Sequence, residues 1–216
     1  MIMGVTRTPN TFDYLGHKLT IRGHHSGAFD GVVDKIKTQL AGWRAKALSW
    51  AGRATLSRVV LQSIPIYTMS IEIAPTQVCQ RLDSIARKFW WGVDQGKSHF
   101  LALKSWESLC KPKRLGGLGF RNFSDMNKSL VAKLGWSILS KSSSPWTSLL
   151  INKYSRRASW LEGNCASNGS STWKGIVKSG DVLTRGVCFR IGDGRTVNVW
   201  TDPWVPWCTG LAQGTR

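Results

Sequence analysis

Apolar residues recur at helical spacing over most of the chain. Between positions 26 and 40 they fall at Phe29, Val32, Val33, Ile36 and Leu40, with steps of three and four residues, so this segment is predicted to be an amphipathic helix. Candidate caps and the same spacing predict further helices. They cover residues 49–65, 76–92, 103–110, 124–139, 145–154 and 172–183.

Two of these predicted helices carry specific expectations about burial. In the segment that follows the candidate cap Ser49, the buried side is predicted to consist of Leu56, Val59, Val60 and Ser63. In the segment 76–92 the apolar stripe is Val78, Leu82, Ile85 and Phe89, and Gly92 is the expected C-terminal cap.

The spacing of apolar residues changes from a helical to an alternating pattern at the two ends of the chain. The segment TFDYLGHKLTI (11–21) is predicted to be a strand or a hairpin, and VCFRIGDGRTVNVW (187–200) alternates on both sides of an Asp193-Gly194 turn, which predicts a β-hairpin. The expected fold class is therefore mainly α, with short β elements at the N-terminal edge and a C-terminal β-hairpin. Four regions are expected, at 1–25, 26–95, 96–160 and 161–216.

Positive charge is the feature that says most about partners. The chain has 30 Lys and Arg against 12 Asp and Glu, a formal net charge of +18 in 216 residues. A surplus of this size indicates a polyanionic partner, with nucleic acid first and an anionic membrane second; a solvated basic surface is the alternative. No apolar run is long enough to cross a bilayer and no signal peptide is recognised, so no membrane partner and no secretion are expected.

The basic residues gather in two segments. GWRAKALSWAGRATLSRVVLQSIPIYTM (42–69) holds two tryptophans and not one acidic residue, and KPKRLGGLGFRNF (111–123) is basic and rich in glycine. Lys and Arg in such segments suit contacts with phosphates, which position a nucleic acid without reading its bases. The candidate binding residues are Lys37, Arg44, Lys46, Arg53 and Arg58, with a second group at Lys111, Lys113, Arg114 and Arg121.

The groups that catalysis needs are not found together in the sequence. The acidic residues are scattered singly, with no paired pattern for two metal ions, and neither a phosphate-binding loop nor a nucleophile elbow occurs. The five cysteines form no C-x-x-C pair, which favours free thiols over a zinc site or a disulfide scaffold. The chain is expected to bind rather than catalyse, with no metal, no cofactor and no small-molecule substrate.

Several long motifs resemble one family. They are YLGHKL, KIKTQLAGWRAKALSWAGRATLSRVVLQSIPIYTM, RKFWWG, LCKPKRLGGLGFRNF, NKSLVAKLGWSIL and FRIGDGRTVNVWTDPWV. In this order and spacing they resemble the region after the palm in reverse transcriptases of plant non-LTR (LINE-type) retrotransposons. The resemblance implies that Tyr14, Leu15 and Gly16 correspond to the last palm strand near the primer grip. It also implies that residues 26–92 form the helical thumb and that the segment from Cys110 begins the connection region.

The departures from the family decide the functional expectation. The Tyr- or Phe-x-Asp-Asp motif, the fingers, the zinc-binding segment and the RNase H-like domain of many relatives are not recognised here. The resemblance thus implies a non-catalytic, intracellular fragment, nuclear or cytoplasmic, that binds RNA/DNA duplex or template–primer. Mg²⁺ would bind only in the missing palm, and a palm-containing chain is a further candidate partner. The alternatives are an orphan remnant without independent function and a general basic nucleic-acid-binding protein.

Overall fold

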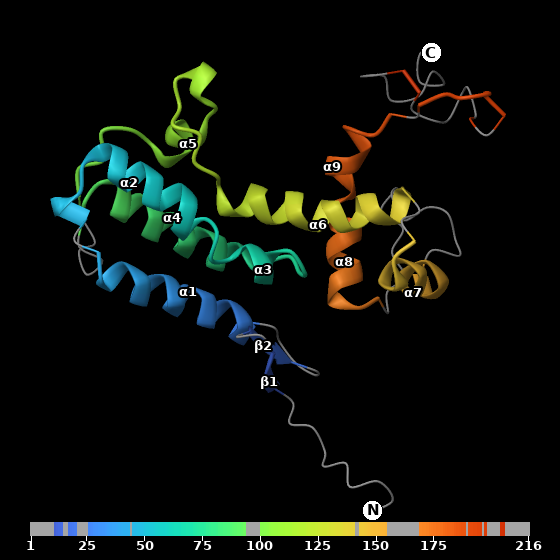
Figure 1. The fold of residues 1–216 in the computed structure, drawn as a ribbon, viewed down its shortest axis with the longest axis horizontal. Helices are drawn as coiled ribbons and strands as arrows, with labels where there is room; N and C mark the ends of the chain where they lie inside the picture. Colours follow the sequence, from blue (N-terminus) through green and yellow to red (C-terminus); the bar gives the residue numbers. More distant parts are fainter. Residues whose placement is uncertain are drawn as a thin grey trace, which may run out of the picture. The chain divides into compact units, whose positions relative to one another are not determined.

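The computed structural model describes residues 11–14, 17–20, 26–43, 45–93, 100–140, 143–154, 169–188, 190–195, 197 and 204–205. These residues are mainly helical, which confirms the predicted class (Figure 1). The chain divides into two compact units, Met1–Asn127 and Lys128–Arg216. The four regions expected from the sequence stay a prediction. No helix among the described residues has both the length and the apolar character that a membrane span requires.

The first unit is built around two long helices. α1 (Ser26–Ala41) lies alongside α4 (Thr76–Trp90) (Figure 1). The apolar stripes predicted for both helices are buried, from Phe29 to Leu40 on α1 and from Val78 to Phe89 on α4. Before α1 come β1 (Thr11–Tyr14) and β2 (His17–Thr20), an antiparallel pair with Thr11 opposite Thr20. The correspondence of this part of the chain to the last palm strand stays a prediction.

The segment between α1 and α4 departs from a regular helix. After the short turn η1 (Ala45–Ala47), α2 (Trp50–Leu56) begins with the predicted cap, because the Ser49 hydroxyl accepts a hydrogen bond from Gly52 N. A π-helical turn, η2 (Ser57–Leu61), follows and leads through a loop to α3 (Ile66–Met69). The extra residue in this turn is seen in the bond from Gln62 N to Ser57 O.

The π-helical turn makes the predicted buried side of this segment wrong. Ser57 and Leu61 are buried, whereas Val59 is 64% exposed and Ser63 is exposed. The prediction assumed a steady period of 3.6 residues. One extra residue per turn changes the direction of every side chain that follows it. Arg58 lies within this turn.

The ends of the next elements show which residues cap them. Gly92 follows α4 with φ +68°, the left-handed conformation expected of a C-terminal cap. Then come α5 (Trp106–Cys110), the 3₁₀ turn η3 (Lys113–Leu115) and α6 (Phe123–Leu139). Asn122 caps α6, because its Oδ1 accepts hydrogen bonds from Ser124 N at 2.9 Å and from Asp125 N at 3.2 Å.

The second unit contains the rest of α6 and three shorter helices. These are α7 (Pro145–Tyr154), α8 (Ser171–Lys178) and α9 (Gly180–Thr184). The predicted helix 172–183 is therefore divided at Ser179, which leaves helical geometry at ψ 1° just before Gly180. Tyr154 stacks on Trp173 with ring centroids 4.9 Å apart, which joins α7 to α8.

The predicted C-terminal hairpin is not supported. The described residues 190–195 form bends and a turn, without a strand, and Gly194 has φ +74°. The Asp193-Gly194 signal therefore gives a local turn. A two-stranded hairpin without a third strand or a covering helix is marginally stable, so a turn signal by itself does not make one. The described residues 187, 188 and 197 are not in a strand either, and residues 189, 196 and 198–200 lie outside the described part of the chain.

Candidate nucleic-acid interface

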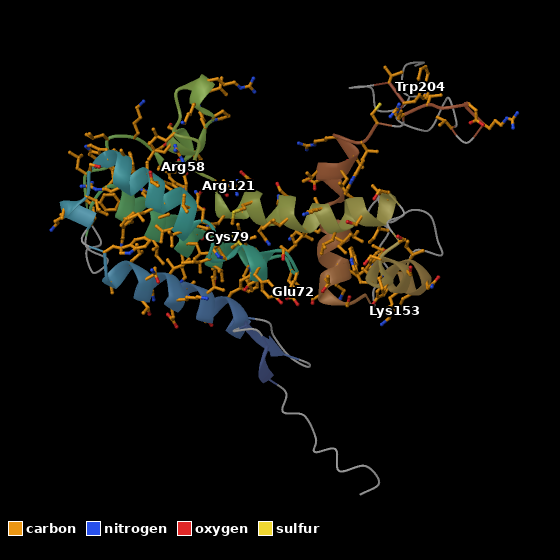
Figure 2. The ribbon with its side chains drawn as sticks, viewed as in Figure 1. Arg58, Glu72, Cys79, Arg121, Lys153 and Trp204 are labelled. Atoms are coloured by element: carbon orange, nitrogen blue, oxygen red, sulfur yellow. The ribbon has the colours of Figure 1, made fainter. Side chains whose placement is uncertain are left out.

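The two basic segments, far apart in the sequence, meet in the first unit. Arg58 Nη2 on η2 donates a hydrogen bond to Leu118 O, and Gln62 Nε2 donates to Arg121 O at 3.2 Å. The Arg58 guanidinium also lies over the Phe120 ring, 5.5 Å from its centroid. Figure 2 labels Arg58 on η2 and Arg121 on the segment that leads into α6. Contacts across about sixty residues thus join the two predicted groups.

The basic turn, which we define as residues 111–119, has a fixed backbone. Leu115 N donates to Pro112 O at 2.8 Å, and Gly119 N donates to Lys111 O at 2.9 Å. Gly117 is buried at a point where a Cβ atom would lie 2.0 Å from Lys111 O, so no side chain fits there. The glycine-rich sequence is therefore a requirement of close backbone packing, and the loop is ordered by its own hydrogen bonds.

The cations of this region are presented to solvent. Lys111, Lys113, Arg114 and Arg121 are all exposed. No acidic side chain in the described part of the chain forms an ion pair with any of them. Three uncompensated charges on the basic turn, together with Arg121 just beyond it, produce a local positive potential of the kind that attracts phosphates.

Arg53 and Arg58 are used differently from these exposed cations. Arg53 Nε donates to Leu48 O and its Nη1 donates to Trp90 O, both at 3.2 Å, while the guanidinium lies 4.7 Å from the centroid of the Trp50 ring. Arg53 therefore ties α2 to the end of α4, as Arg58 ties η2 to the basic turn. Phosphate contacts by these two residues stay predictions, and each already has a structural role.

The other predicted residues are spread over the unit. Lys37 lies on α1, half exposed, and pairs with Asp34 at 3.6 Å, while Lys46 is exposed on η1. Tyr14 ends β1. Arg44, Leu15 and Gly16 lie outside the described residues. The roles assigned to all of them stay predictions.

A cluster of buried aromatic rings packs against the residue that follows the basic turn. Trp90 at the end of α4 and Trp106 at the start of α5 both contact Phe120, with ring centroids at 5.3 and 5.5 Å. All three rings are buried. These tryptophans belong to the core, in line with the usual place of this residue, and they fix the position of the segment that carries Arg121.

Asp83 is a residue of this region that sequence reasoning missed. Its carboxylate accepts hydrogen bonds from Trp106 Nε1 at 2.8 Å, from Asn122 Nδ2 at 3.2 Å and from Phe123 N at 3.3 Å. It thus joins α4 to α5 and to the first turn of α6. Burial raises the pKa of Asp83 from 3.8 to about 6, and the hydrogen bond from Trp106 opposes that rise.

Asn127 is the second residue that sequence reasoning missed. Its Nδ2 donates to Met69 O at 2.7 Å and to Glu72 O at 2.8 Å, and its Oδ1 accepts from Ala74 N at 2.8 Å. One buried amide therefore satisfies three backbone groups of the 69–74 turn. The sequence signal that could have found it was a polar residue directly after Met126, on the helix side that carries the buried apolar residues of α6.

The described residues include three free cysteines, Cys79, Cys110 and Cys188. No group of three or more His, Cys, Asp or Glu side chains with a geometry suited to a metal ion occurs in this part of the chain. Burial raises the pKa of Cys79 to about 11 and that of Cys110 to about 12. Both thiols therefore stay protonated near neutral pH, where a thiol is a poor nucleophile.

Two plant proteins are similar to this chain, and no protein-family model matches it. "Putative ribonuclease H protein At1g65750" of Arabidopsis thaliana is 39% identical over 184 residues, which are 82% of this chain and 29% of that protein. "Uncharacterized mitochondrial protein AtMg00310" of Arabidopsis thaliana is 32% identical over 144 residues, which are 66% of this chain and 93% of that protein. The chain thus spans less than a third of the first relative and nearly all of the second.

The chain belongs to the same family as the mitochondrial protein AtMg00310, because the match covers almost the whole of that relative. Relatives of these two kinds are typical of plant proteins derived from retrotransposons. The word mitochondrial is part of that relative's name; the nuclear or cytoplasmic location expected for this chain stays a prediction.

Proposed function

We propose that this chain is a non-catalytic part of a plant retrotransposon reverse transcriptase and that it holds template–primer nucleic acid through the basic turn and Arg121. The observation that carries the proposal is the union of two basic segments on one fixed surface, where Arg58 binds the backbone of Leu118. The plant relatives, one of which has ribonuclease H in its name, fit the retrotransposon origin that the motifs imply.

The geometry favours contacts with the sugar–phosphate backbone over base recognition. The exposed charged groups of the region are all Lys and Arg side chains, a set that binds phosphates of any sequence. Two exposed cations that follow one another, Lys113 and Arg114, suit neighbouring phosphates. A helical thumb that positions a duplex for a palm supplied elsewhere is the role that the resemblance implies, and it requires this kind of sequence-independent grip.

The test is the dependence of affinity on salt. For the wild-type chain the logarithm of the association constant is expected to fall linearly with the logarithm of salt concentration, by about 0.9 per phosphate neutralised. Replacing the four exposed cations by Ala should reduce this slope by about 3 to 4. The variant changes Lys111, Lys113, Arg114 and Arg121, and leaves Arg53 and Arg58 in their structural roles.

A charge-matched control separates a local site from net charge. It replaces four exposed cations of the second unit by Ala, namely Lys133, Lys174, Lys178 and Arg185. The proposal expects the control to keep most of the wild-type slope. Equal losses in the two variants would contradict a site at the basic turn. Primer extension on an RNA template is expected to give no product, and a product would overturn the non-catalytic assignment.

A further inference from the structure

Leu115 stands at the last position of η3, between two exposed cations and a left-handed glycine. Its side chain is 63% exposed, and Lys113 and Arg114 before it are exposed as well. Single exposed apolar residues are common on protein surfaces and call for no explanation by themselves. The position of Leu115 does call for an explanation, because the turn that carries it has a hydrogen-bonded backbone and is positively charged.

The backbone under Leu115 is fixed on both sides. Leu115 N donates to Pro112 O at 2.8 Å, and Gly116 N donates to Lys113 O at 3.0 Å. Gly116, at φ +77°, then takes the chain back toward Gly117, which packs on Lys111 O. These bonds fix the backbone that carries Leu115, and its side chain stays exposed next to the exposed Lys113 and Arg114.

We propose that Leu115 is an apolar wedge that enters a weakened base step of a nucleic-acid duplex, while Lys113 and Arg114 contact the phosphates beside it. Proteins that bend duplexes insert Leu and similar side chains between base pairs in this way, next to basic residues that hold the backbone. The inference rests on the proposed function and deepens it, since it names a duplex with an easily unstacked step as the preferred ligand.

Charge selects this ligand over an apolar groove on another protein. A leucine that docks into a groove of another protein is usually surrounded by side chains that also lose their contact with water on binding. Here the adjacent side chains are Lys113 and Arg114, and no described acidic residue pairs with them. The phosphates that flank a base step supply the compensating charge on both sides of an inserted side chain.

The experiment compares short duplexes with and without one central mismatch, in DNA·DNA and in RNA·DNA arms, by fluorescence anisotropy. A mismatched step is cheaper to unstack, so the wild-type chain is expected to prefer it by about five- to tenfold. Leu115→Ala should remove that preference and keep the salt slope. The control Leu149→Ala, which truncates a leucine 70% exposed on α7, should keep both.

A second measurement does not depend on any variant. With 2-aminopurine beside the mismatch, insertion of the wedge unstacks the probe, so the wild-type chain should raise its fluorescence. Absence of a mismatch preference, an equal preference in Leu115→Ala, or an unchanged probe signal would each overturn the wedge and leave the salt-dependent grip standing. Failure of the wild-type chain to bind any duplex would remove the proposed function, and the wedge with it.

Discussion

Replacing Asn127 by Ala is expected to destabilise the first unit strongly. The Asn127 side chain is 2% exposed and satisfies Met69 O, Glu72 O and Ala74 N. Truncation leaves these three groups without their partner, and each unsatisfied buried group costs about 1–3 kcal/mol. Glu72 is only partly buried, so water can reach its carbonyl. The lower part of the summed range, about 3 to 5 kcal/mol, is therefore the expected loss.

The assay is equilibrium unfolding in urea, followed by tryptophan fluorescence and by circular dichroism. The midpoint should fall while the slope with urea stays constant, since a change in slope would indicate a different unfolded state or loss of two-state behaviour. The control Asn152→Ala makes the same chemical change at an exposed position of α7. Its expected effect is within about 0.5 kcal/mol.

A third variant separates the donors of Asn127 from its acceptor. Asn127→Asp keeps an oxygen for Ala74 N but loses both donors and brings a carboxylate against two carbonyl oxygens. It should therefore cost at least as much as Asn127→Ala. A loss below about 1 kcal/mol for Asn127→Ala, with an unchanged urea slope, would refute the reasoning, because the amide would then not be satisfying buried groups.

Two further predictions concern the basic turn and the carboxylate beneath it. Gly117→Ala places a Cβ 2.0 Å from Lys111 O, so the turn must shift. The free energy of unfolding should fall by about 1–3 kcal/mol, and the dependence of nucleic-acid affinity on salt should weaken. The control Gly31→Ala, where the added Cβ meets open space on α1, should not lower the melting temperature. The pKa of Asp83 in the folded state is raised to about 6, so the folded state binds this proton more tightly than the unfolded chain does. The stability of the wild type relative to Asp83→Asn should therefore fall as the pH rises from about 4 to about 6. A stability difference that does not change with pH would contradict this pKa.

The regular helices were the predictable part of the fold. The stripes of α1 and α4 and the Ser49 cap were all visible in the sequence, because a cap and an apolar stripe depend on residues within a few positions of one another. The turn at η2 was not predictable in the same way. A π-helical turn is rare and replaces one local hydrogen-bond pattern with another, so regular apolar spacing does not predict it; here it leaves Ser57 and Leu61 buried.

The candidate site was predictable only in its composition. The sequence shows two cationic segments without paired acids. It contains no local signal that Arg58 would bind the backbone of Leu118, about sixty residues away, or that Asp83 would join three helices. Contacts between distant segments depend on how whole elements pack, and no pattern of a few residues records them.

The sequence by itself determined the charge of this protein, its helical class and its scattered acidic residues, since these follow from residue types and their local spacing. Only the tertiary structure decided what each cation does. Arg53 and Arg58 donate hydrogen bonds to backbone carbonyls. Lys113 and Arg114 instead remain exposed, on a turn that can close only because Gly117 has no side chain. Residues of one charge have these different roles because a side chain's partners are set by the segments that packing brings beside it.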